Sequence, residues 1–232
     1  MLIKRRRDFH TDSCAVIAQL IPALQILGDE FIPSKGPCVV TMNHYTRSGF
    51  KIWWAALSIS SILPLPIHWV ITSEWTTPGK WYEPFKSSLS RFIANRITQV
   101  YDFTSMPPMP PRSKEVQARV ASVREVLTYS KQNEGFAMIG LAPEGGDQPD
   151  RRLMMPPPGV GRFCLLLAAQ HLKFVPVGVY ESKGIFYLNF GRDYELNVCN
   201  NLSTKAKDSS AAEIIMRNIA SLLPMELRGE FN

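Results

Sequence analysis

Two short polar segments of the 232-residue chain carry side chains that can do chemistry, and each follows an apolar run. Asn43-His44 comes after Cys38–Met42, and Pro143-Glu144-Gly145-Gly146 comes after Phe136–Leu141. A histidine changes charge near neutral pH, so His44 is either a proton acceptor or a capping or core side chain. Its place after a strand and the preceding asparagine favour the functional interpretation. The second segment is either a plain turn or a loop whose backbone N–H groups face a bound anion.

The order of the apolar patterns determines where these residues lie in the fold. Short buried strands alternate with amphipathic helices, and no repeat or long linker divides residues 1–232. We therefore expect a single α/β domain, with a largely parallel mixed sheet flanked by helices. Ligands of such sheets bind beyond the carboxyl ends of the strands. This rule places the candidate site on the loops at 43–49, 102–112 and 142–159.

The apolar spacing and the capping residues give approximate boundaries. We expect helices at 12–28, 50–62, 84–95, 113–127, 160–171 and 210–222. We expect strands at 38–42, 67–72, 97–101, 136–141, 174–179 and 185–190. Ser13 and Gly28 are the expected ends of the first helix, and Ser210 and Glu213 form a capping box before the last. The helix after Ser113 has an apolar stripe expected to be buried, at Val116, Val120, Val123 and Leu127.

The uncharged run Ile52–Ser73 is long enough to span a bilayer. Its prolines Pro64 and Pro66 would each cost about 3 kcal/mol inside a helix. We therefore interpret the run as a buried helix, a proline break and a strand, with a membrane-dipping hairpin as the alternative.

Four motifs follow in a fixed order along the chain: Asn43-His44, an arginine-bearing segment, Pro143-Glu144-Gly145, and Phe174-Val175-Pro176-Val177. Gly161-Arg162-Phe163 lies between the last two. This order resembles the glycerolipid acyltransferase family, which includes lysophosphatidic acid and glycerol-3-phosphate acyltransferases. The blocks of that family run N-H-x-x-x-x-D, an arginine block, F-P-E-G-T-R and V-P-V. Each motif alone is weak, but together they cover residues 20–225, nearly the whole chain.

The resemblance implies O-acyl transfer. A fatty acyl thioester, on coenzyme A or acyl carrier protein, would react with a hydroxyl group of a glycerolipid- or lysophospholipid-like acceptor. His44 would be the general base that removes the hydroxyl proton. The acyl thioester is a co-substrate, and neither a cofactor nor a metal is implied. The residues implied to bind substrate are Asn43, Arg47, Arg96, Pro143, Glu144, Gly145 and Gly146.

The chain departs from the family pattern at the position that orients the base. Gly49 stands where the motif has Asp, and loss of the comparable Asp from a hydrolase triad costs about 10⁴ in kcat. Asp147, on the loop that faces His44 in the family architecture, is a candidate to supply the missing carboxylate. The alternative function is therefore a catalytically impaired member that binds lipid or membrane without turnover.

Two further departures concern the cations of the family. Gly146-Asp147 replaces Thr-Arg of the third block. Arg96 ends a string that matches the family's F-I-x-R, yet by element order that arginine should follow the strand at 97–101, where Asp102 stands. Arginines bind phosphate well, so Arg151 and Arg152 are candidates to compensate.

Charge and cysteine usage indicate the compartment. The chain has 26 Lys and Arg against 20 Asp and Glu, a net charge of +6. Residues 1–10 carry four cations (Lys4, Arg5, Arg6, Arg7) and one anion (Asp8), so half of the excess lies before the expected amphipathic helix at 12–28. This arrangement fits an anionic membrane surface, and we expect a cytoplasmic protein peripherally associated with the inner face of a membrane.

Other localisations and partners have less support. Polar residues follow the basic cluster, which argues against a signal peptide. No recognition motif accompanies the positive charge, so nucleic acid is not an expected partner. The four cysteines lack C-x-x-C spacing, which argues against a zinc site and fits a reducing cytosol: Cys14, Cys38, Cys164 and Cys199.

Overall fold

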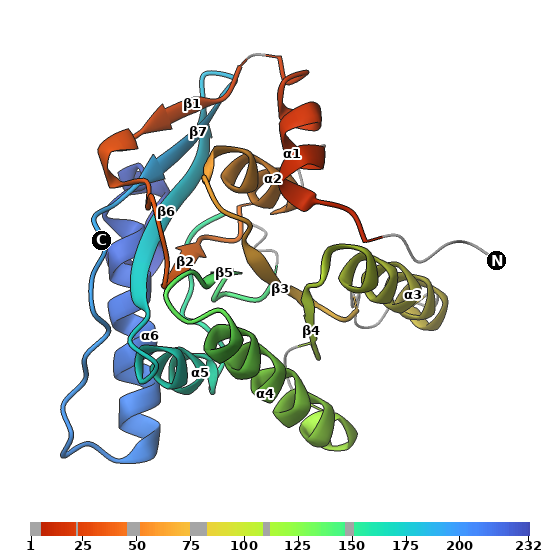
Figure 1. Cartoon of the computed structure of the whole chain (residues 1–232). Coiled ribbons are helices and arrows are strands. Elements are labelled where there is room, and N and C mark those ends of the chain that lie inside the picture. Colours follow the sequence, from red (N-terminus) through yellow and green to blue (C-terminus); the bar gives the residue numbers. More distant parts are fainter. Residues whose placement is uncertain (1–5, 22, 46–51, 75–82, 109–111, 147–150) are drawn as a thin grey trace.

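The computed structural model describes residues 6–21, 23–45, 52–74, 83–108, 112–146 and 151–232. In these ranges the chain forms a seven-stranded sheet with helices on both faces (Figure 1). The strands are β1 (Gln25–Leu27), β2 (Cys38–Met42), β3 (His68–Thr72), β4 (Thr104–Met106), β5 (Met138–Leu141), β6 (Lys173–Ser182) and β7 (Ile185–Phe190). The helices are α1 (Phe9–Ile17), α2 (Ile52–Ile62), α3 (Glu83–Tyr101), α4 (Val116–Gln132), α5 (Val160–Ala168) and α6 (Thr204–Ala220).

The strands lie in the order β1-β7-β6-β2-β5-β3-β4. Every neighbouring pair is parallel except β6 and β7, which form an antiparallel hairpin. The expected single α/β domain with a largely parallel mixed sheet is confirmed. Because β2, β5, β3 and β4 are consecutive and parallel, their carboxyl ends meet at one edge of the sheet. The loops that follow these four strands therefore share that edge.

The core lies on both faces of the central strands. All residues of β2 and β5 are buried, as is β6 from Phe174 to Tyr180. The helices α1 and α2 pack together on the α3 side of the sheet, whereas α4, α5 and α6 follow one another on the other side (Figure 1). A parallel sheet covered on both faces favours apolar residues at consecutive positions, which explains the run from Cys38 to Met42, in which the one polar residue, Thr41, is also buried.

The N-terminal region differs from the expected helix at 12–28. The helix α1 is shorter and begins earlier, with the Asp8 carboxylate as its N-cap. Residues 25–27 instead form β1, which pairs with β7, so residues 12–28 are not one continuous helix. Gly28 does have a left-handed φ of 64°, but it precedes a short 3₁₀ turn, and a Cβ there would meet the Phe190 carbonyl oxygen at 2.1 Å. The glycine is required for close packing and not for ending a helix.

The expected strand at 97–101 is also wrong, because α3 continues to Tyr101 and the strand β4 follows it. Ile97 and Tyr101 pack against the core one helical turn apart, which extends the apolar stripe of α3. Asp102, with φ of 59°, then ends the helix in the left-handed conformation. The boundary of β4 matters for the site, since it changes which residue follows the strand.

Two helices on the other face differ in detail from the expectation. In α4 the buried residues are Ser122, Val126 and Ser130, whereas Val116 and Val120 are 50% and 40% exposed. The helix is thus rotated from its expected stripe, because small serines allow a close approach to the sheet. The helix α6 begins at Thr204 with Ser203 as N-cap, ahead of the expected capping box at Ser210 and Glu213.

The uncharged run folds as a helix followed by a strand. The helix α2 buries Ala55, Ser58, Ile59 and Ser60, and β3 joins the sheet between β5 and β4. The interpretation as a buried helix, a break and a strand is confirmed. No helix in the described part of the chain has both the length and the apolar character needed to cross a bilayer.

Candidate active site

His44 lies two residues beyond β2, and its neighbours hold its backbone in place. The Asn43 side chain is 2% exposed and forms a closed pair with the backbone of Val179 in β6. Its amide nitrogen donates to the Val179 carbonyl oxygen at 2.8 Å, and its carbonyl oxygen accepts the Val179 N–H at 2.7 Å. The side chain thus continues the hydrogen bonding between β2 and β6 past the end of the strand.

The residue after His44 is anchored to the same neighbouring strand. Tyr45 is 3% exposed, and its hydroxyl donates to the Glu181 carboxylate at 3.2 Å. His44 therefore lies between two residues that are both fixed to β6. These contacts on both sides restrict the backbone of the half-buried His44. A general base must be held in position in this way.

Glu144 is the third anchor, and it comes from the loop after β5. One carboxylate oxygen accepts the His44 N–H at 2.6 Å, and the other accepts the Met154 N–H at 3.1 Å. Burial raises the pKa of Glu144, while these two hydrogen bonds and the charge of His44 oppose the rise. The carboxylate therefore joins the loops after β2 and β5 and places a negative charge close to His44.

The glycines of the Pro-Glu-Gly-Gly segment form a tight turn at the rim of the site. Pro143 and Glu144 are buried, whereas Gly145 is exposed and has a left-handed φ of 67°. The Gly145 N–H donates to the Ala142 carbonyl oxygen at 3.1 Å. This hydrogen bond closes the turn. The space next to Gly146 is open, because a Cβ placed there would meet no atom within 4 Å.

The structure separates Arg96 from these residues. The helix α3 starts after β3 at the His44 edge and returns to the opposite edge before β4 begins. Arg96 lies five residues before the end of α3, so it is on the far side from His44. With β4 at 104–106, the arginine that follows the strand is Arg112.

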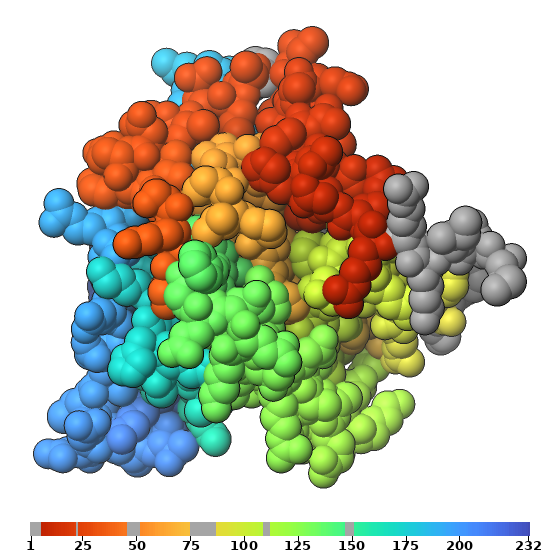
Figure 2. Space-filling model, viewed as in Figure 1, coloured from red at the N-terminus to blue at the C-terminus, as the bar shows by residue number. Residues whose placement is uncertain are grey.

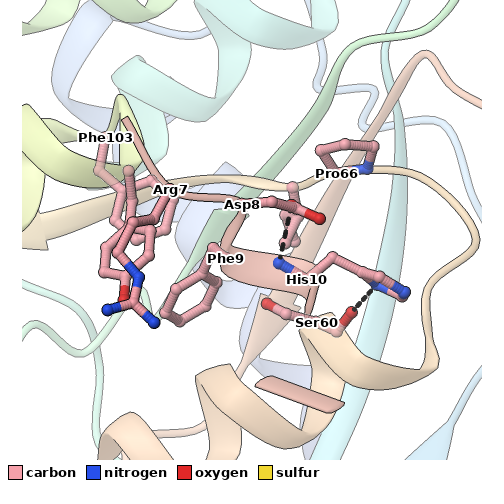
Figure 3. A pocket seen from close by; sticks show the side chains of 9 residues that line it. Arg7, Asp8, Phe9, His10, Ser60, Pro66 and Phe103 are labelled. Carbon is pink, nitrogen blue, oxygen red and sulfur yellow. Dashed lines mark hydrogen bonds between the residues drawn. The ribbon is translucent and has the colours of Figure 1, made fainter. Parts of the chain in front are cut away.

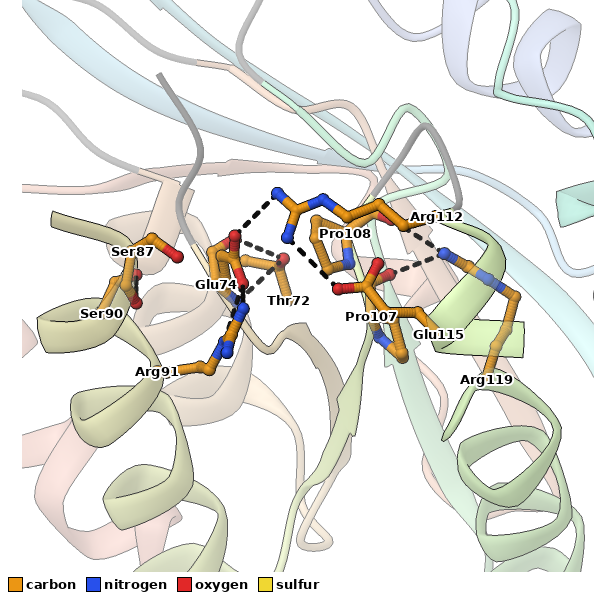
Figure 4. A network of polar contacts seen from close by, with 10 residues as sticks. All are labelled: Thr72, Glu74, Ser87, Ser90, Arg91, Pro107, Pro108, Arg112, Glu115 and Arg119. Carbon is orange, nitrogen blue, oxygen red and sulfur yellow. Dashed lines mark hydrogen bonds and ion pairs between the residues drawn. The ribbon is translucent and has the colours of Figure 1, made fainter. Parts of the chain in front are cut away.

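Arg112 belongs to a charged cluster that the sequence interpretation missed. Its guanidinium donates to Glu74 at 2.9 Å and to Glu115 at 3.3 Å. Glu74 follows β3 and also accepts hydrogen bonds from Arg91 of α3 (Figure 4). The sequence signal for Arg112 was its position after a strand, but the wrong boundary of β4 hid it. Nothing in the sequence pairs Glu74 with arginines so far along the chain.

Three of the sequence candidates, namely Arg47, Gly49 and Asp147, lie outside the described residues. Arg151 and Arg152 are exposed, ahead of Leu153, whose N–H donates to the Leu227 carbonyl oxygen. In the described ranges, histidines, cysteines and carboxylates nowhere form a group that could hold a metal ion.

A cavity of about 140 Å³ lies at the opposite edge of the sheet, before β3 and β4 (Figure 3). The N-terminal segment forms one wall, where the His10 Nδ1–H donates to the Ser60 carbonyl oxygen at 2.7 Å. Two other lining residues, Arg7 and Tyr101, donate hydrogen bonds to the Asp12 carboxylate at 2.7 Å and 2.8 Å. These contacts attach the N-terminus to α2 and α3, and the cavity is separate from His44.

Comparisons with known proteins agree with this architecture. A family model described as Acyltransferase matches residues 23–180. Among solved structures, the chain resembles the crystal structure of the 1-acyl-sn-glycerophosphate (LPA) acyltransferase PlsC from Thermotoga maritima, with a TM-score of 0.54. The two sequences are 14% identical, and the match covers 92% of this chain and 78% of that chain. No curated protein matches the chain. At this identity the structural likeness shows a shared fold.

Proposed function

Since this chain belongs to the acyltransferase family, we propose that it transfers a fatty acyl group from an acyl thioester to a hydroxyl group of a glycerolipid-type acceptor. The resemblance of its fold to a lysophosphatidic acid acyltransferase supports this class of acceptor. The observation that carries the proposal is the placement of His44. Three buried side chains from β2, β5 and the loops beside them hold it at the ligand-binding edge of the sheet: Asn43, Tyr45 and Glu144.

In this mechanism the His44 imidazole takes the proton of the acceptor hydroxyl as its oxygen attacks the thioester carbonyl carbon. The carbon–sulfur bond of the resulting tetrahedral intermediate breaks, and the imidazolium returns the proton to the departing thiolate. The products are an ester and a free thiol. No atom changes its oxidation state in these steps, so the chemistry requires no redox cofactor.

Glu144 supports the base although Gly49 replaces the motif aspartate. Its carboxylate interacts electrostatically with His44, so it favours the imidazolium that forms during transfer. Its hydrogen bond to the His44 N–H also fixes the backbone. We propose that Glu144 is a positioning residue with part of the role of the absent aspartate. Asp147 lies outside the described residues, and we keep it as a second proposed source of the carboxylate that orients His44.

The remaining candidates have proposed roles in binding. Pro143, Gly145 and Gly146 flank Glu144, which contacts the His44 N–H, and Asn43 immediately precedes His44. Arg47 comes five residues after β2 in the sequence and lies outside the described residues, and Arg96 lies toward the other edge of the sheet, so both stay proposals. We propose that the donor is acyl-coenzyme A or acyl carrier protein, whose anionic groups suit loop arginines.

We also propose peripheral contact with an anionic membrane at the cytoplasmic inner face. The basic residues at positions 4–7 and the exposed Val16 and Ile21 support it. Arg6 and Arg7 also pair with Asp102 and Asp12, so part of their charge is balanced within the protein.

The test of the proposed function is an acceptor screen. Purified protein is incubated with acyl-coenzyme A or acyl carrier protein and a panel of glycerol- and lysolipid-type alcohols. We expect thioester loss that depends on the acceptor and yields an ester, and we expect His44→Ala to abolish it. Turnover with none of the acceptors would contradict the proposal and favour a lipid-binding member without activity, as Gly49 in place of the aspartate suggests.

A further inference from the structure

A buried carboxylate lies among arginines at the edge of the sheet that carries His44 (Figure 4). Glu74 follows β3, and its side chain is 1% exposed. Arg91 of α3 donates to one of its oxygens from both Nε, at 2.8 Å, and Nη2. Arg112, beyond β4, donates to the other oxygen at 2.9 Å. The Glu74 carboxylate thus accepts hydrogen bonds from N–H groups of two guanidinium groups, those of Arg91 and Arg112.

These arginines are the kind of donor that a phosphate would use. A guanidinium binds carboxylate and phosphate through the same planar pattern of N–H groups. Arg91 and Arg112 are themselves 49% and 36% exposed, so the cluster borders solvent while its acid is buried. Burial alone would raise the pKa of Glu74, but hydrogen bonds from Arg91, Arg112 and Ser87 outweigh burial and lower it to about 2. Glu74 is therefore an anion at every pH at which a cell operates.

The other contacts of the cluster neutralise it further. Arg112 also donates to Glu115, at the start of α4, at 3.3 Å. The charges of Glu74, Glu115, Arg91 and Arg112 add up to zero. Arg119, the next cation along α4, donates to the Pro107 and Pro108 carbonyl oxygens at 2.9 Å each. The three arginines described at the ends of β3 and β4, namely Arg91, Arg112 and Arg119, are thus occupied by groups of the protein itself, whereas Lys114 is exposed.

The cluster is close enough to His44 to contact the same acceptor. In the sheet, β3 is separated from β2 only by β5, and all three strands are parallel. Neighbouring strands are about 4.8 Å apart, so the ends of β2 and β3 are about 10 Å apart. An acceptor whose hydroxyl group lies at His44 therefore extends toward Glu74 and Arg112 with the rest of its head group.

We infer that Glu74 determines acceptor specificity: it occupies Arg91 and Arg112, so the site takes a hydroxyl lipid that carries no phosphate next to them. This inference rests on the proposed acyl transfer at His44. An anionic head group would have to displace a buried carboxylate from two charge-assisted contacts before it could bind the same donors. An uncharged glycerol head group requires no such exchange.

The test compares two acceptors that differ by a single phosphate. A monoacylglycerol and its 3-phosphate, with acyl chains short enough to stay monomeric, are offered to the wild type, to Glu74→Gln and to Glu213→Gln. Glu213 pairs with Arg217 on the surface of α6 and is the matched control. We expect the wild type to have the higher kcat/KM with the monoacylglycerol. Glu74→Gln should raise the relative kcat/KM for the phosphate by at least about tenfold, whereas Glu213→Gln should not change it.

The double variant Glu74→Gln/Arg112→Gln identifies the group responsible. If the released Arg112 binds the phosphate, the second substitution removes the gain. A wild type that prefers the phosphorylated acceptor overturns the inference without a variant, and leaves the proposed acyl transfer intact. If neither acceptor is turned over, the proposed function fails. Binding of the same two lipids, followed by tryptophan fluorescence, then decides the inference, and tighter wild-type binding of the phosphate would overturn it.

Discussion

At the scale of single residues, the candidate chemistry depends on how firmly His44 is held. The sequence identified His44, Asn43 and Glu144 from their places after strands, and the structure brings these three together. The anchor between Tyr45 and Glu181 could not be found in this way, because the two residues lie 136 positions apart and carry no local signal. Contacts between loops that are distant in the sequence depend on which strands are neighbours in the sheet. A single sequence does not determine that order in detail.

The first prediction concerns Glu144, whose two oxygens accept two backbone N–H groups. Glu144→Gln leaves a single oxygen acceptor and removes the negative charge beside His44. We expect kcat to fall about tenfold or more with little change in KM, because a nearby charge contributes roughly 1–4 kcal/mol. Steady-state kinetics with the acceptor found in the screen measures this.

Glu230→Gln is the control for that experiment, since Glu230 accepts the neighbouring Met155 N–H at 2.8 Å. If the loss of a hydrogen bond to this loop were enough to lower kcat, Glu144→Gln and Glu230→Gln would lower it equally. Such a result would contradict a role for the Glu144 charge.

The second prediction concerns Glu74 and the dependence of stability on pH. Its pKa is lowered from an ordinary 4.5 to about 2 in the folded chain. The stabilisation is therefore fully present above pH 4.5 and is lost as the pH falls toward 2, with an upper bound of about 3 kcal/mol. We expect the unfolding free energies of the wild type and Glu74→Gln, measured with denaturant, to converge over this range. A difference that stays constant from pH 6 to pH 2 would count against the ionised, arginine-bound Glu74.

At the scale of elements, the buried central strands were easier to predict than the edge strands β1 and β4 and the ends of the helices. The run Cys38–Met42 is apolar except for Thr41 because both faces of β2 are covered, so its type and bounds were clear. The stretch 97–101 was misread because Ile97 and Tyr101 fit either a short strand or the last turn of a helix. Only the packing of α3 against the core decides between them. That error hid Arg112, whose place is defined by the end of β4.

The third prediction concerns the start of α5, which is capped by a residue from another helix. Gly159, the N-cap of α5, offers no side chain, and Asp208 of α6 accepts the Gly159 and Arg162 N–H groups at 2.7 and 2.8 Å. We expect Asp208→Ala to lower the free energy of unfolding by about 2 kcal/mol, since two backbone donors lose a charged acceptor. Chemical denaturation measures the change.

The matched control is Asp193→Ala, which breaks an exposed pair with Lys173. Exposed pairs contribute at most about 1 kcal/mol. Equal destabilisation by the two substitutions would contradict the capping role of Asp208.

At the scale of the whole molecule, the net charge of +6 is unevenly distributed. The basic residues near the N-terminus precede α1, which packs on α2 and is shorter than the amphipathic helix expected from the sequence. Figure 2 shows the described N-terminal residues packed over α2 and beside α3, and the Arg7 N–H donates to the Val100 carbonyl oxygen at 3.0 Å. Of the basic residues, Arg6 and Arg7 are therefore attached to the body of the protein near one side of the sheet.

The fourth prediction concerns binding to membranes. Replacing the four cations at positions 4–7 with Gln should weaken binding to phosphatidylserine-containing vesicles by at least about tenfold, because each cation near an anionic surface contributes about 1 kcal/mol. The effect should diminish as salt increases. Co-sedimentation measures it, with Lys205→Gln/Lys207→Gln on α6 as the control. Equal binding to neutral and anionic vesicles would contradict the proposed contact.

The rate of acceptor-dependent thiol release by His44→Ala tests the central claim most directly. His171→Asn is the control, because His171 is exposed beyond α5 and has a left-handed φ of 63° that Asn tolerates. If His44 is the general base, its substitution lowers kcat by roughly 10²–10⁴, while the control keeps the wild-type rate. A folded His44→Ala variant that releases thiol as fast as the wild type would show that His44 is not the base.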